Sequence, residues 1–131
     1  MEIKEEARAG VKVIGLRGRL NAQTSPAAEK RLMDLTDLSE QKFVFDFSEV
    51  TFVSSGGLAL LLKVAKNVQK ANGKLVLAAL SSYVHEVFEI AGFTSIFSIF
   101  PTCEEAVIHL QGGTGSERGR SNPPGSAGSL G

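Results

Sequence analysis

The chain has 131 residues, of which 43% are hydrophobic and 21% are charged, and these values are typical of one globular domain with a single core. The 14 basic and 14 acidic residues cancel to a formal net charge of zero, and no basic stripe gathers on one predicted element, so nucleic acid is not an expected partner. The single cysteine, Cys103, excludes an internal disulfide, and neither a membrane span nor the apolar core of a secretion signal occurs, so we expect a cytoplasmic protein.

The first 23 residues predict a strand pair followed by a loop. Residues 11–16 (VKVIGL) have the apolar, β-branched composition of a strand, and a weaker strand is expected near residues 2–7. Ala9 and Gly10 lie between them as a turn. Residues 18–23 are then expected to form a loop.

A helix is predicted to begin at Ser25 and Pro26. Serine is a favoured N-cap, and proline suits the first helical position because its missing N–H would have no partner there. Apolar residues recur from this point at three- and four-residue spacing, as on one face of a helix: Ala28, Leu32, Leu35 and Leu38.

The most informative stretch is residues 43–62, FVFDFSEVTFVSSGGLALLL. Its apolar run over 43–47 predicts a buried parallel strand, which is followed by a polar turn at Ser48 and Glu49 and a second apolar step over 50–53. The tetrad Ser54-Ser55-Gly56-Gly57 then opens a helix. Serines at this position lie beside backbone N–H groups that lack helical partners, so a phosphate on one of them would be well held.

The helix that starts at Ser55 has an apolar stripe and a polar side. The stripe consists of Leu58, Leu61, Leu62, Ala65 and Val68. The other side carries Lys63, Lys66, Asn67 and Lys70. Asn72 and Gly73 are expected to end the helix.

The remaining elements alternate between strand and helix. Residues 74–80 resemble a strand, residues 83–91 a helix capped by Ser81 or Ser82, residues 96–100 a short strand, and residues 102–110 a last helix. Residues 112–131 are rich in Gly, Ser and Pro, which predicts a disordered tail and leaves one domain over residues 1–111.

The order β-β-α-β-α-β-α-β-α predicts an α/β fold. We expect a mainly parallel, mixed sheet of about five strands with about four helices, the first strand being antiparallel at an edge. Functional groups in such sheets usually lie beyond the carboxyl ends of the strands. Asn21, Asp46, Ser54 and Ser55 are expected to converge at that edge.

Several motifs, in chain order, resemble those of the STAS-domain family, and in particular the bacterial anti-sigma factor antagonists. They are residues 18–24 (GRLNAQT), 46–48 (DFS), 57–58 (GL), 72–77 (NGKLVL) and 87–93 (VFEIAGF). The resemblance spans nearly all of residues 1–111 and implies a single STAS-like domain. Where family members carry Asp-Ser-Ser-Gly-Leu, this chain has Ser54 at the Asp position, Ser55 at the phosphoacceptor and Gly56 at the second serine. Asn21 stands where many members carry Asp.

The resemblance implies partner switching. The unmodified protein would bind an anti-sigma factor that is also a serine kinase, and so release a sigma factor. The kinase would phosphorylate Ser55, with Ser54 as the alternative acceptor, and a serine phosphatase would reverse this. The docking surface would comprise Asn21, Asp46, Ser54, Ser55, Gly56, Gly57, Lys63 and Lys66. The alternative is a STAS-type adaptor subunit of a transporter or signalling complex, without a phosphoswitch.

Purely structural interpretations of the same residues remain open. Ser54 and Ser55 are acceptable as helix caps alone, Gly56 and Gly57 as a close helix–sheet contact, and Asp46 as the cap of a turn. No Cys–His pair, Gly-x-Ser-x-Gly elbow, phosphate-binding Gly-x-x-x-x-Gly-Lys loop or metal-ligand spacing occurs in the sequence. We therefore expect no enzyme, no cofactor and no metal.

Overall fold

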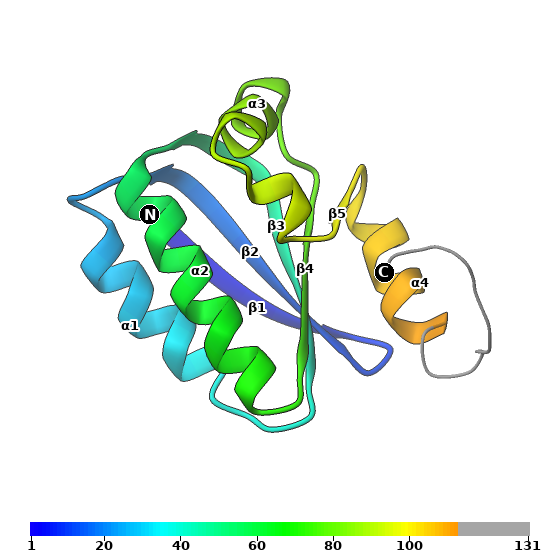
Figure 1. Cartoon of the computed structure of the whole chain (residues 1–131). Helices are drawn as coiled ribbons and strands as arrows, with labels where there is room; N and C mark the ends of the chain where they lie inside the picture. The colour runs from blue at the N-terminus through cyan, green and yellow to red at the C-terminus, as the bar shows by residue number, and fades with distance from the viewer. Residues whose placement is uncertain (113–131) are drawn as a thin grey trace.

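The computed structural model describes residues 1–112, so the predicted tail lies outside the described residues from residue 113 on. A five-stranded sheet in the order β1-β2-β3-β4-β5 forms its centre (Figure 1). The strands are β1 (Glu2–Arg8), β2 (Val11–Leu20), β3 (Lys42–Val53), β4 (Lys74–Ala78) and β5 (Ile99–Phe100). The helices are α1 (Ser25–Leu35), α2 (Ser55–Lys70), α3 (Ser82–Ile90), the 3-10 helix η1 (Phe93–Ser95) and α4 (Cys103–Gly112).

The strand pairing confirms the predicted fold class. β1 pairs with β2 in the antiparallel sense, and the pairs β2–β3, β3–β4 and β4–β5 are all parallel. The antiparallel strand therefore lies at one edge of a mainly parallel sheet, and each parallel step is made through a connection that contains a helix.

Helices cover both faces of the sheet, unequally. α1, α2 and α3 contribute to one large core on one face, and α4 packs on the other face, as Figure 1 shows. β3 supplies both cores because its side chains alternate: Phe43, Phe45 and Phe47 enter the first, and Val44 enters the second. The buried face of α2 is shifted relative to the predicted stripe, because Leu60 and Val64 are buried whereas Leu62 and Ala65 are only half-buried.

The predicted polar turn at Ser48 and Glu49 is wrong, because β3 continues through it to Val53. The pairing register between β2 and β3 shifts twice along this stretch. At each shift β3 has one more residue than β2, which forms a bulge, and the strand pairing continues after it. The carboxylate of Asp46 accepts a hydrogen bond from the N–H of Ser48 at 2.9 Å, which satisfies a backbone donor at the first bulge. The predicted loop over 18–23 is also shorter than expected, because β2 runs on to Leu20.

Helix α1 begins and ends earlier than the sequence indicates. Thr24, not Ser25, is the N-cap residue, and the Ser25 hydroxyl donates to the backbone oxygen of Asn21 at 2.6 Å. The helix ends at Leu35, and the buried Thr36 that follows donates its hydroxyl to the Leu32 carbonyl, at 2.7 Å. Leu38 therefore lies beyond the helix and is 43% exposed.

The second half of the chain follows the prediction with smaller shifts. Asn72 adopts the left-handed conformation (φ 61°), and the N–H of Gly73 bonds the Val68 carbonyl at 2.9 Å, which ends α2. β4 ends at Ala78 and Ser81 caps α3. The strand expected over 96–100 is reduced to two residues, because Phe93 and Phe97 pack their rings against Phe88 of α3.

Candidate functional site

The junction between β3 and α2 is built around Ser54. Ser54 has extended backbone angles, and its hydroxyl oxygen accepts a hydrogen bond from the N–H of Gly57 at 3.4 Å, as an N-cap residue does. Its own N–H donates to the carbonyl of Leu20 at the end of β2, at 2.9 Å. Ser54 thus both caps α2 and ties the start of the helix to the neighbouring strand.

Ser55 is the first residue of α2 and is exposed. Its hydroxyl makes no hydrogen bond with any group of residues 1–112, which distinguishes it from Ser54. The first-turn N–H groups and the positive end of the helix dipole surround this position, so a negative charge here is electrostatically favoured.

The two glycines of the tetrad have different roles. A Cβ at Gly57 would lie 2.7 Å from the Leu20 carbonyl oxygen, whereas a Cβ at Gly56 would meet its nearest atoms at 3.7 Å. Gly57 is therefore required for the close approach of α2 to β2, as the structural interpretation predicted. Gly56 has room for a Cβ, and one of its near neighbours is Ala22 of the β2–α1 loop.

Asn21 shapes that loop. Its side-chain oxygen accepts hydrogen bonds from the N–H groups of Gln23 and Thr24, at 2.9 and 3.0 Å. The Thr24 hydroxyl in turn donates to the Arg19 carbonyl at 2.7 Å. Since Ala22 lies against Gly56, the loop that Asn21 organises borders the Ser54–Gly57 segment, and this part of the expected convergence is confirmed.

Asp46 does not join the cluster. Its neighbours Phe45 and Phe47 point into the core beneath α2, so Asp46 points to the opposite face of the sheet. There it lines a shallow cleft with Gly15 and Ser48. The expectation that Asp46 converges with the serines is wrong, and its hydrogen bond at the bulge gives it a structural role.

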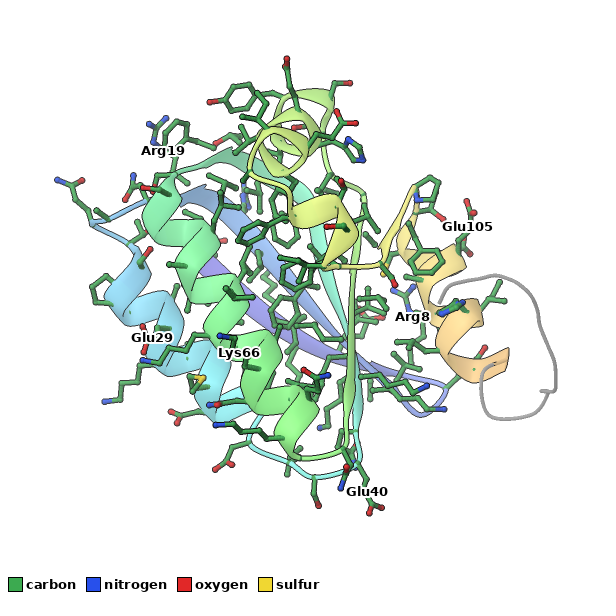
Figure 2. The ribbon with its side chains drawn as sticks, in the orientation of Figure 1. Arg8, Arg19, Glu29, Glu40, Lys66 and Glu105 are labelled. Carbon is green, nitrogen blue, oxygen red and sulfur yellow. The ribbon has the colours of Figure 1, made fainter. Side chains whose placement is uncertain are left out.

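The two lysines expected on the docking face are in different situations. Lys63 forms an ion pair with Glu29 of α1, with 2.6 Å between Nζ and Oε2. Lys66 is exposed, has no ion-pair partner in the part of the chain that the structure describes, and lines a groove beside Leu62 and Ile96. Figure 2 shows both Glu29 and Lys66 on the side of α1 and α2 that faces away from the sheet.

The structure also brings together three residues whose proximity the sequence does not predict. The guanidinium of Arg19 lies over the ring of Phe52, 4.5 Å from its centre, and Phe52 stacks on Tyr83 with 6.4 Å between ring centres. They come from β2, β3 and α3. The sequence signal for this cluster is weak, because pairing Arg19 with Phe52 depends on the two bulges that set the strand register.

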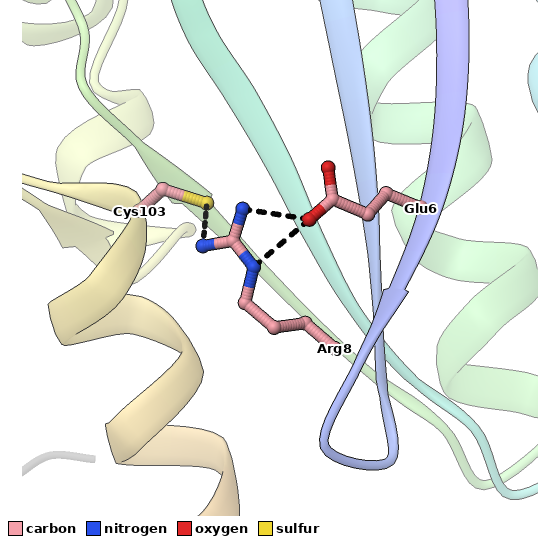
Figure 3. A network of polar contacts seen from close by, with 3 residues as sticks. All are labelled: Glu6, Arg8 and Cys103. Carbon is pink, nitrogen blue, oxygen red and sulfur yellow. Dashed lines mark hydrogen bonds and ion pairs between the residues drawn. The ribbon is translucent and has the colours of Figure 1, made fainter.

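Cys103 lies away from the junction, at the start of α4. Figure 3 shows Arg8 between the two side chains that it contacts: it donates to the carboxylate of Glu6 at 2.8 and 3.1 Å and to Cys103 Sγ at 4.0 Å. Burial, and then the charge of Asp46, raise the pKa of the Cys103 thiol. The thiol is therefore kept protonated, and it serves as part of the contact between α4 and the β1 edge.

Among residues 1–112, no three His, Cys, Asp or Glu side chains gather in a way that would hold a metal ion. Over the same residues, no helix has the length and apolar character that crossing a membrane requires.

Residues 2–106 match the family model described as the STAS domain. BtrV of Bordetella bronchiseptica, named provisionally as an anti-sigma factor antagonist, is 35% identical over 106 residues, which cover 81% of this chain and 91% of that protein. A solved anti-sigma factor antagonist from Mycobacterium paratuberculosis has a TM-score of 0.77 at 24% identity and covers 84% of this chain and 93% of its own.

The anti-sigma factor antagonist SpoIIAA has been solved in two forms. The unphosphorylated form has a TM-score of 0.70 at 21% identity, covering 85% of this chain and 97% of its own. The phosphorylated form, described as a Bacillus cell fate determinant, has a TM-score of 0.62 at 19% identity, with 83% and 99% covered. At these identities the likeness shows the fold.

Proposed function

Because this chain belongs to the STAS-domain family, we propose that it is a non-catalytic regulator, an anti-sigma factor antagonist that binds an anti-sigma factor and thereby frees a sigma factor. Support comes from the names of its relatives: BtrV and the Listeria monocytogenes anti-sigma-B factor antagonist both belong to this functional class. The docking surface proposed for the partner is the end of the sheet at which the β2–α1 loop meets the first turn of α2.

We further propose that phosphorylation of Ser55 switches this binding off. The observation that carries the proposal is the contrast between the two serines. Ser54 is engaged as the cap of α2, whereas the hydroxyl of Ser55 is exposed and has no bonding partner among residues 1–112. A kinase can therefore reach Ser55 without first disrupting the helix.

The chemistry assigned to the partner is simple. The anti-sigma factor, as a serine kinase, would transfer the γ-phosphoryl group of ATP to Ser55 Oγ, releasing ADP and the hydroxyl proton. A serine phosphatase would later hydrolyse the phosphoester to inorganic phosphate and restore the hydroxyl. Neither step requires a catalytic group on this chain.

Release of the partner follows from the added charge. A phosphoserine carries about −1.5 to −2 charges at neutral pH. The first turn of α2 tolerates this charge, so the fold stays the same. A docked partner surface would have to desolvate the phosphate and oppose its charge, which lowers affinity.

The test compares three forms of the full chain, each immobilised: the wild type, Ser55→Ala and Ser55→Glu. Lysate of the source bacterium is passed over each, and the retained proteins are identified by mass spectrometry. We expect the wild type and Ser55→Ala to retain a serine-kinase anti-sigma factor that Ser55→Glu loses. Equal retention of a transporter or scaffold protein by all three would contradict the switch and favour the adaptor function.

The modified residue is determined separately. The retained kinase is incubated with ATP and the wild type, Ser54→Ala or Ser55→Ala, and the phosphorylated residue is located by mass spectrometry. We expect Ser54→Ala to be phosphorylated and Ser55→Ala not to be. The opposite result would make Ser54 the acceptor.

A further inference from the structure

A stack of one cation and two aromatic rings lies at the surface, at the end of the sheet where α2 begins. Arg19 is exposed, Phe52 is half-buried and Tyr83 is 50% exposed. The Arg19 guanidinium lies 4.5 Å from the centre of the Phe52 ring, and the Phe52 and Tyr83 rings are inclined by only 21°. In Figure 2, Arg19 is drawn at the same end of the molecule as the first turn of α2.

Two residues of the stack lie one step of the strand pairing from the Ser54–Ser55 junction. Arg19 is the register partner of Phe52, and the next pair along the same two strands is Leu20 and Val53. The carbonyl of that same Leu20 accepts the N–H of Ser54. One step of the strand ladder therefore separates the stack from the capped start of α2.

Arg19 differs from the other arginines of the β1–β2 pair. Arg8 is paired with Glu6, and Arg17 is paired with Glu2 and Glu49. Arg19 has no carboxylate partner among residues 1–112. A guanidinium that lies over an aromatic ring still has outward N–H groups in a planar fork, and this geometry fits a carboxylate.

We propose that Arg19, Phe52 and Tyr83 form the main affinity-determining patch of the surface that docks the anti-sigma factor, and that the partner contacts it with a carboxylate beside an apolar side chain. This inference rests on the proposed function. Arg and Tyr are enriched among the residues that dominate binding energies, and a stack already ordered in the free protein loses little entropy on docking.

The same patch connects docking to phosphorylation. A partner that docks across this end of the sheet would place a carboxylate on Arg19 and would also cover the first turn of α2, where Ser55 is exposed. A phosphate on Ser55 would then repel that carboxylate and compete with it for Arg19. The partner would lose its principal ionic contact while the fold of this chain is unchanged.

The proposal is tested by calorimetric titration with a purified serine-kinase anti-sigma factor of the source bacterium, without ATP. The variants are Arg19→Ala, Arg19→Gln, Tyr83→Ala and Ser55→Glu, with Arg31→Ala as the matched control, since Arg31 is an exposed arginine of α1 with no ion-pair partner in the described part of the chain. Thermal unfolding of each variant checks that it is folded.

We expect Arg19→Ala, Arg19→Gln and Tyr83→Ala each to weaken binding by about tenfold or more, and Arg31→Ala by less than about twofold. The loss from Arg19→Gln should shrink as salt is raised from about 0.05 to about 0.5 M, because screening weakens the ionic contact. If Ser55→Glu weakens binding while the Arg19 and Tyr83 variants bind as the wild type does, the patch is refuted and the proposed function stands. If the wild type binds no such anti-sigma factor, both are refuted.

Discussion

Gly57 sets how closely α2 can approach β2, and replacing it with alanine tests this directly. The new Cβ would lie 2.7 Å from the Leu20 carbonyl oxygen and 2.8 Å from Leu20 Cγ, whereas ordinary contacts are 3.4–4 Å. Leu20 has no room to retreat, because its side chain is fully buried and its carbonyl already accepts the N–H of Ser54. The start of α2 must therefore move outward.

The expected loss of stability follows from two opposing effects. Overpacking of a well-packed site costs about 1–3 kcal/mol. Alanine in a helix is favoured over glycine by up to about 1 kcal/mol. Gly57→Ala should therefore lower the free energy of unfolding by about 1–2 kcal/mol. Gly56→Ala has only the favourable term, because its Cβ would meet its nearest atoms at 3.7 Å, so it should be neutral or stabilising.

The assay is urea unfolding of the full chain, followed by far-UV circular dichroism. The curves of the wild type, Gly56→Ala and Gly57→Ala are fitted with one common dependence of the unfolding free energy on urea concentration. A difference of about 2 kcal/mol between the two variants corresponds to roughly 8 °C in Tm for a domain of this size. If Gly57→Ala unfolds at the same urea concentration as Gly56→Ala, or at a higher one, the close contact between Gly57 and Leu20 does not constrain the helix.

Three further predictions concern single side chains. Ser54→Ala should lower the free energy of unfolding by about 0.5–1 kcal/mol because it removes the cap of α2, while Ser55→Ala should change it by less than about 0.5 kcal/mol; the reverse order in urea unfolding would contradict the assignment of the cap. Asn21→Asp should keep the two hydrogen bonds that shape the β2–α1 loop, and Asn21→Ala should lose them and melt at a lower temperature; equal melting of the two variants would exclude this role. Burial, and then the positive charge of Lys74, lower the pKa of His109 from its ordinary value of 6.5. The folded state therefore favours the neutral imidazole. The contribution of His109 to the free energy of unfolding is complete above pH 6.5 and is lost as the pH falls below 6.5 towards the folded-state pKa. Removing His109 by His109→Gln should reduce the loss of stability between about pH 7 and 5, and unchanged pH dependence in urea unfolding would contradict the shift.

Local patterns were enough to predict the element order and the position of the tetrad. The alternation of period-2 and period-3.6 segments, and the serines before a leucine-rich run, are properties of a few neighbouring residues. These local patterns could not decide which serine caps α2. If the helix began one residue later, Ser55 would be the cap and Ser54 would lie outside the helix. That distinction needed the hydrogen bond from Gly57.

Two features that the sequence did not predict, the continuation of β3 through Ser48 and the meeting of Arg19 with Phe52, share one physical source, which is the pairing of β2 with β3. Taken alone, Ser48 and Glu49 are polar enough to indicate a turn, but β2 extends past them and the strand absorbs extra residues as bulges. The side on which Asp46 points follows instead from the alternation of side chains along β3, in which Phe45 and Phe47 enter the core. The meeting of Arg19 with Phe52 depends on the strand pairing. Neighbours across a bulged parallel ladder are not encoded in the periodicity of either strand.

For the phosphoswitch proposed at Ser55, the residues at the junction imply a change in the sign of the local charge. Serine caps a helix about as well as aspartate does, so Ser54 keeps the structural role of the aspartate in the resembling motif without its negative charge. Asn21 likewise forms through its amide oxygen the loop hydrogen bonds that an aspartate would form. In the unmodified chain, Ser54 and Asn21 therefore add no negative charge to the end of the sheet that carries the exposed cation of Arg19. Adding a phosphate of about −1.5 to −2 would change the sum of these two charges from +1 to about −0.5 to −1. A partner carboxylate that is attracted before modification would be repelled after it, and neither state requires the helix or the sheet to move.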